Sequence, residues 1–127
     1  MALLLDAGGL IGYDRRNKTV IAFIDKAQRD QIPVRTTTAV VAQVWRDGSK
    51  QVRLARLLAG VDERDLTNPR SRSIGVLLAA SRTADVVDAS LVDIAFDGDE
   101  ILTSDPHDLR VLAEALGKRL TIVTVSA

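Results

Sequence analysis

Hydrophobic residues follow two different spacings along the chain, and their alternation predicts the fold class. Short, continuous apolar runs are typical of buried parallel strands. They alternate with longer segments in which apolar residues recur every three or four positions, as they do on one face of a helix. Strands that alternate with helices favour an α/β sandwich with a mainly parallel sheet. The predicted strands are 2–6, 32–36, 100–104 and 120–125, with a short edge strand within 61–66. The predicted helices are 17–30, 37–46, 50–60, 70–81, 85–95 and 106–116.

The segment that follows the first strand is rich in glycine and is predicted to turn tightly. Gly8, Gly9 and Gly12 do not match the G-x-G-x-x-G pattern of dinucleotide-binding proteins, which disfavours that class. Gly75 lies inside a predicted helix, where glycine costs around 1 kcal/mol relative to alanine, so we expect another element to approach closely there.

Acidic residues follow the predicted strands. Asp6 comes after the first strand, Asp105 after the strand at 100–104, and Asp85 and Asp88 open the helix at 85–95. Strand ends and the starts of the following helices share one edge of a parallel sheet, where ligands bind. Two unit charges 4 Å apart interact by about 4 kcal/mol at an effective dielectric of 20, and a hard divalent cation such as Mg²⁺ removes such repulsion. These aspartates can equally be helix caps and turn residues.

Composition limits the possible chemistry. The 127 residues fit one domain and include no cysteine and a single histidine, which excludes thiolate and histidine-rich metal sites. The formal net charge of zero argues against strong non-specific nucleic-acid binding but allows a local basic patch. No apolar stretch is long enough to span a bilayer, and we expect a cytoplasmic protein.

Two features remain open to more than one interpretation. The predicted helix from Lys50 to Gly60 carries Lys50, Arg53 and Arg56 on one side, as an RNA-binding or partner-binding surface does, although a solvated helix face has the same pattern. Trp45 is expected in the core or in a dimer interface, and His107 at the surface of the last helix.

Several segments in order resemble the PIN-domain family and, within it, the VapC-type toxins of bacterial toxin–antitoxin pairs. The segments are LLLDAGGLIG at 3–12, TTTAVVAQVWR at 36–46, SIGVLLAAS at 73–81, TADVVDASLVDIA at 83–95 and ILTSDPHDL at 101–109. The resemblance covers nearly the whole chain. It implies one PIN-like domain over residues 1–127, a three-layer sandwich with a mainly parallel five-stranded sheet flanked by helices.

The resemblance also implies a function and a set of site residues. Members are endoribonucleases that use Mg²⁺ or Mn²⁺, are usually homodimers and are neutralised by a VapB-type antitoxin. Asp6, Asp88 and Asp105 match the catalytic, metal-binding acids. The implied accessory residues are Gln43, Asp85, Ser104 and Asp108, and the residues expected to contact RNA are Arg46, Lys50, Arg53 and Arg56.

Gln43 departs from the family pattern, because the family typically has glutamate at this position. Glutamine keeps a carbonyl oxygen but loses the charge, so metal binding should be weaker. One alternative is therefore a PIN-fold binding module with weak or no catalysis. Another is a phosphoacceptor domain like a response-regulator receiver, which is disfavoured because Leu5, and not a second acid, precedes Asp6.

Overall fold

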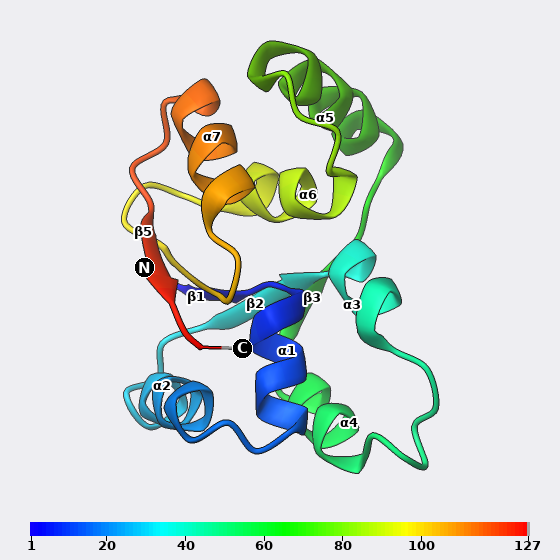
Figure 1. Cartoon of the computed structure of the whole chain (residues 1–127), viewed down its shortest axis with the longest axis vertical. Coiled ribbons are helices and arrows are strands. Elements are labelled where there is room, and N and C mark those ends of the chain that lie inside the picture. The colour runs from blue at the N-terminus through cyan, green and yellow to red at the C-terminus, as the bar shows by residue number, and fades with distance from the viewer. Residues whose placement is uncertain (127) are drawn as a thin grey trace.

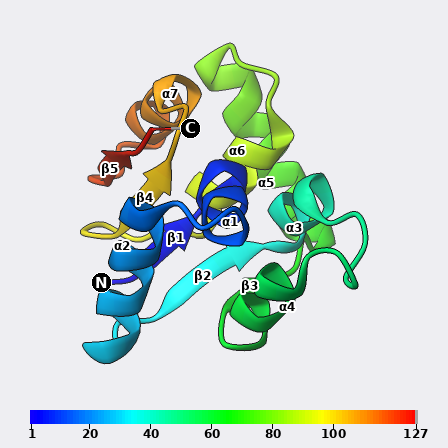
Figure 2. The ribbon, with the colours of Figure 1, turned by 60° about the horizontal axis from the view of Figure 1, so that its bottom comes forward.

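A five-stranded parallel sheet forms the centre of the protein. The computed structural model describes residues 1–126, and the strands lie in the order β3-β2-β1-β4-β5 with every neighbouring pair parallel (Figures 1 and 2). The predicted mainly parallel five-stranded sheet is confirmed. The strands are β1 (Leu3–Leu5), β2 (Val34–Thr37), β3 (Asp62–Arg64), β4 (Glu100–Thr103) and β5 (Thr121–Thr124).

Helices cover both faces of the sheet and complete three layers. Figure 1 shows α1, α2 and α4 on one side and α5, α6 and α7 on the other, with α3 beside the end of β2. The helices are α1 (Ala7–Asp14), α2 (Lys18–Arg29), α3 (Thr38–Val44), α4 (Val52–Ala59), α5 (Asn68–Ser81), α6 (Val86–Ile94) and α7 (His107–Leu116). Among the described residues, every helix is too short or too polar to cross a membrane.

The central strand β1 and its neighbour β4 are the most deeply buried part of the sheet. Leu4, Leu5, Ile101 and Leu102 are completely inaccessible to solvent. Helices pack on both faces of these strands, and this explains why their sequences are continuously apolar instead of alternating.

The strand order fixes where a ligand site can lie. β1 pairs with β2 on one side and with β4 on the other, so the winding direction of the chain reverses between β1 and β4. Ligands of open α/β sheets bind at such a reversal, outside the carboxyl ends of the strands. Leu5 is in register with Leu102, which brings the residues after both strands to the same edge. Receiver-like domains have the order 2-1-3-4-5, so the receiver interpretation is wrong.

Helix α1 was not predicted, because its glycines indicated only a turn. Asp6 caps the helix, and Leu10 packs in the core. Gly12 permits close packing between helices, since a Cβ there would lie 2.8 Å from Val20 Cγ2. Tertiary packing therefore outweighs the low helix propensity of glycine.

Trp45 is the C-cap of α3 and is 38% exposed, which excludes the core and leaves the dimer interface as a prediction. Two further expectations are wrong. Gly75 has no atom within 4 Å of a Cβ built on it, so no element approaches it. The basic segment is helical only from Val52, so Lys50 precedes α4, and Arg46 lies beyond the end of α3.

Candidate functional site

Five carboxylates gather where β1 and β4 end. Asp6 follows β1, Asp105 follows β4, Asp85 and Asp88 begin α6, and Asp108 lies in the first turn of α7. The charges of all four other acids contribute to raising the pKa of Asp88. The fold thus brings together the three predicted ligands and two predicted accessory acids.

Asp6 is buried and held rigidly. It is only 6% exposed, and its Oδ1 accepts a hydrogen bond of 2.9 Å from the backbone N–H of Gly9 as the N-cap of α1. Burial raises the pKa of Asp6, the Thr103 hydroxyl and the N–H groups of Gly9 and Gly8 lower it, and the charge of Asp105 raises it further. The carboxylate is therefore fixed in position with a preference for a nearby cation.

Thr103 links the two acids at the strand ends. Its side chain is completely buried, hydrogen-bonds the Asp6 carboxylate and accepts a 2.9 Å hydrogen bond from the backbone N–H of Asp105. Sequence reasoning named Ser104 and missed Thr103. The signal was present, since alternate strand residues point to the same face and Thr103 is two positions before Asp105. Ser104 instead lies against α1, where a Cβ on Gly8 would come within 3.0 Å of its backbone nitrogen.

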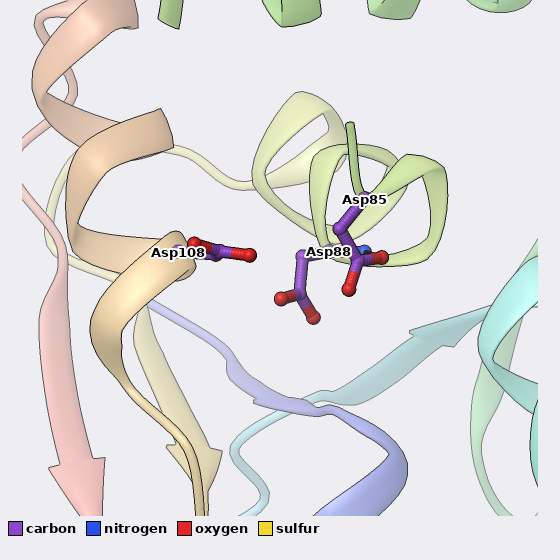
Figure 3. A group of neighbouring side chains, drawn as sticks. All are labelled: Asp85, Asp88 and Asp108. Carbon is purple, nitrogen blue, oxygen red and sulfur yellow. Dashed lines mark hydrogen bonds between the residues drawn. The ribbon is translucent and has the colours of Figure 1, made fainter. Parts of the chain in front are cut away.

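Asp85, Asp88 and Asp108 form the tightest group of acids. Each offers a carboxylate oxygen, and these oxygens lie within 4.8 Å of one another. Figure 3 shows Asp85 and Asp88 on α6 facing the first turn of α7, from which Asp108 points toward Asp88. Asp85 is also the N-cap of α6, accepting a 3.0 Å hydrogen bond from the backbone N–H of Asp88. The capping interpretation is thus confirmed for Asp85, whose second oxygen stays available to a ligand.

The electrostatics of Asp88 indicate a site suited to a cation. Desolvation, followed by the charges of Asp85, Asp6, Asp108 and Asp105, raises the pKa of Asp88 to about 7. A proton partly neutralises the group in the absence of another cation. Helices α1, α6 and α7 also begin at this edge. The positive ends of their dipoles offset part of the repulsion between the carboxylates. Carboxylate oxygens are the donors that Mg²⁺ and Mn²⁺ prefer, so the residues present fit such an ion.

Contacts on three sides hold the helix that carries Asp88. Near its start, the hydroxyls of Thr37 and Ser90 lie 2.8 Å apart, and the Ser90 hydroxyl donates to the Val87 carbonyl. At its end, Lys118 Nζ donates to the carbonyls of Val92 and Asp93, each at 2.9 Å.

The Asp93 side chain forms an ion pair with a neighbouring helix. Its Oδ2 lies 3.2 Å from Arg70 Nη1, which joins α6 to α5. These contacts limit the movement of α6 relative to the sheet.

Gln43 is not joined to the acids. Its side chain is exposed on α3, and within residues 1–126 it has no hydrogen bond to any of the five carboxylates. The position at which the resemblance expects glutamate therefore contributes no charge to the site.

The four residues expected to contact RNA do not all lie in one place. Arg46 Nη1 donates to the carbonyls of Trp45 at 2.7 Å and Ala42 at 3.4 Å, next to the end of α3. The other three line a separate hollow of about 220 Å³ with Val52 and Asp14: Lys50, Arg53 and Arg56. Asp14 is already engaged, because its Oδ1 accepts from the backbone N–H of Leu54.

The fold matches a known structure although the sequence has no recognisable match. No protein-family model matches the sequence, and neither does any curated protein. A chain in the crystal structure of VapBC2 from Rickettsia felis, bound to a DNA fragment from their promoter, aligns with a TM-score of 0.70 and 9% sequence identity. The alignment covers 97% of this chain and 99% of that chain. The protein therefore has the PIN-type α/β fold that its sequence predicts.

Proposed function

We propose that this protein is a metal-dependent endoribonuclease of the VapC toxin type, neutralised by a VapB-type antitoxin. The observation that carries the proposal is the gathering of five carboxylates at the reversal point of a PIN-type sheet. The structural similarity to a chain of a VapBC complex supports the same class. By that resemblance we also expect a cytoplasmic homodimer.

Asp6, Asp88 and Asp105 are the proposed ligands of Mg²⁺ or Mn²⁺, with Asp85 and Asp108 beside them. When bound by these residues, such an ion would supply polarisation of the scissile phosphate and a lowered pKa for the attacking water. Asp6 is the fixed member of this set, because the Gly9 N–H and the Thr103 hydroxyl hold it. Asp88 differs from Asp6 because burial and the neighbouring acids raise its pKa to about 7. It must therefore release a proton before it can bind a cation.

Basic side chains in and before α4, together with Arg46, are the proposed contacts to the RNA backbone. Lys50, Arg53 and Arg56 share one hollow, and phosphate contacts there would add affinity without sequence preference. Arg46 can join them only by leaving the carbonyls at the end of α3.

A second function rests on Gln43, whose side chain is exposed and uncharged. With a charge missing from the expected set, the fold could serve as a binding module for an antitoxin or for RNA. The two functions differ in RNA turnover and in affinity for divalent cations.

The deciding experiment is cleavage of total bacterial RNA by the purified protein in Mg²⁺ or Mn²⁺. Cleavage that is abolished both by EDTA and by Asp88→Asn, but not by Asp25→Asn, is expected of the nuclease. Asp25 is the matched control because it is an exposed acid on α2. Inactivity of the wild-type protein combined with activity of Gln43→Glu would instead establish the binding module.

A further inference from the structure

A second hollow runs along α1, away from the basic residues of α4. It measures about 500 Å³ and lies between α1 and the segment that follows β5. One end is next to the acids, because Ser104 adjoins Asp105 in sequence and the backbone N–H of Gly8 lowers the pKa of Asp6. Its lining residues are Gly8, Ile11, Gly12, Arg15, Asn17, Ser104 and Ser126. We call it the α1 groove.

The α1 groove has an apolar middle and polar ends. Ile11 and the backbone of Gly8 and Gly12 supply the apolar wall. Asn17 closes the far side by donating a 3.0 Å hydrogen bond from Nδ2 to the Ser126 carbonyl. A flat heterocycle fits such a wall, since its faces are apolar and its edges bear hydrogen-bonding groups.

Positive charge lies at the end of the α1 groove that is distant from the acids. Arg15 is exposed at the C-cap of α1, next to Arg16, and Lys18 begins α2. None of the three forms an ion pair with another described residue. From Gly8 to Arg15 the helix rises roughly 10 Å, at 1.5 Å per residue. An acidic end, an apolar middle and a basic end thus follow one another over a short distance.

We infer that the α1 groove binds the RNA strand beside the scissile bond, seating one nucleoside against Ile11 and placing a neighbouring phosphate at Arg15. This inference rests on the proposed ribonuclease function and names a part of its substrate site. A single-stranded polynucleotide has the matching order of groups: a phosphate at the cation held by the acids, a base and sugar along the apolar wall, and a second phosphate at the guanidinium. Arg15 is thereby a second RNA contact, on a different surface from Lys50, Arg53 and Arg56.

The first test measures binding of a fluorescent single-stranded RNA of mixed sequence in the Asp88→Asn background, which keeps the RNA intact. Arg15→Glu should weaken binding about tenfold, whereas Arg15→Lys should keep most of it. Arg15→Ala should reduce the slope of log affinity against log salt by about 0.7, the value for one phosphate contact on a single strand. Arg29→Glu is the matched control, because Arg29 is an exposed cation at the far end of α2.

The second test fills the α1 groove directly. The chain has no cysteine, so Ser126→Cys introduces one labelling site. A bulky maleimide on Cys introduced at position 126 should block RNA binding, and bound RNA should slow the labelling. Ala80→Cys on α5 is the control, since this exposed residue lies on a helix that covers the opposite face of the sheet (Figure 1).

The outcomes separate the groove from the nuclease. Equal effects of Arg15→Glu and Arg29→Glu, together with unhindered RNA binding by the labelled protein, would overturn the inference even where the wild-type protein cleaves RNA. Protection of position 126 that grows with protein concentration in the absence of RNA would also overturn it, because a second copy would then occupy the groove. Arg15-dependent binding and blocking by the maleimide support the groove even where no cleavage occurs, and in that case only the nuclease function fails.

Discussion

The hydroxyl oxygens of Thr37 and Ser90 lie 2.8 Å apart and join the start of α3 to the helix that carries Asp88. The direction of the hydrogen bond follows from the neighbouring groups. The Ser90 hydroxyl donates to the Val87 carbonyl at 2.6 Å, and Thr37 accepts at 3.2 Å from the Val40 N–H, so Thr37 must donate to Ser90. Both side chains are only 2% exposed, so water cannot replace either partner.

Removing this contact should destabilise the protein. Thr37→Val deletes both the hydrogen bond to Ser90 and the cap on Val40, and we expect a loss of about 2 kcal/mol. Urea unfolding followed by circular dichroism measures it. Thr19→Val, at an exposed position in the first turn of α2, is the matched control and should change stability by less than about 0.5 kcal/mol. Equal unfolding midpoints for the two variants would contradict the role given to Thr37.

The cation-free protein should lose stability as the pH rises from 4 to 8. The pKa of Asp88 is raised from 3.8 to about 7 in the folded state, so between these values the folded protein holds a proton that the unfolded chain has released. Folding therefore takes up a proton in this window, and stability falls with increasing pH.

Asp88→Asn should remove most of this loss. Because Asp88 is partly exposed, we expect a gain of roughly 1–2 kcal/mol at pH 8 and almost none at pH 4. Thermal unfolding in EDTA at several pH values measures the difference. A variant with the same pH slope as the wild type would show that Asp88 does not titrate in this range, and Asp25→Asn serves as the control.

Divalent-cation binding should depend on the same proton. Below about pH 7 the cation must displace it from Asp88, so the apparent affinity for Mn²⁺ should fall up to about tenfold per pH unit. Titration calorimetry at pH 6, 7 and 8 measures this. Affinity that does not change with pH would place the ion away from Asp88.

Gln43→Glu tests whether the exposed position on α3 communicates with the site. If a glutamate there can turn toward the acids, Mn²⁺ affinity should rise about tenfold in the same titration. Gln28→Glu is the control, since Gln28 is exposed near the end of α2 and the substitution adds the same charge. Equal affinities for the two variants would show that position 43 lies outside the metal site.

Asp99→Ala should be among the most destabilising single substitutions of a polar residue. This carboxylate is 2% exposed and accepts from the backbone N–H of Ala2 at 2.8 Å and of Phe96 at 2.9 Å. Its loss leaves the buried N–H of Ala2 and the part-buried N–H of Phe96 without partners, at a cost of about 3 kcal/mol. The control is Asp97→Ala, which removes one exposed hydrogen bond to Arg119. Urea midpoints that do not separate the two variants would contradict this assignment.

The arrangement of the acids could be predicted because it follows from local pattern. Continuous apolar runs identify β1 and β4 as buried strands, and a parallel sheet brings Asp6 and Asp105 to one edge. Asp88 was predictable from its place at the start of a helix. The metal and the catalytic role of these residues stay predictions.

Other parts of the site depend on tertiary contacts that no periodic pattern in the sequence indicates. Thr103 binds Asp6 across nearly the whole chain, and Thr37 meets Ser90 from a distant helix. The α1 helix was missed for a similar reason, because its stability comes from packing against β1, β4 and α4 and not from its own propensity. Trp45 does not lie in the core, because apolar character alone does not tell a core residue from an exposed one, and its place in a dimer interface stays a prediction.

The pairing of β1 with β4 has a consequence for protein synthesis. Asp6 leaves the ribosome long before Asp105 and Asp108, because most of the other strands and helices lie between them in the chain. Until β4 inserts beside β1, the nascent chain holds its acids apart and contains no assembled centre. The acidic site is therefore complete only in the finished molecule, once every strand of the sheet is in place.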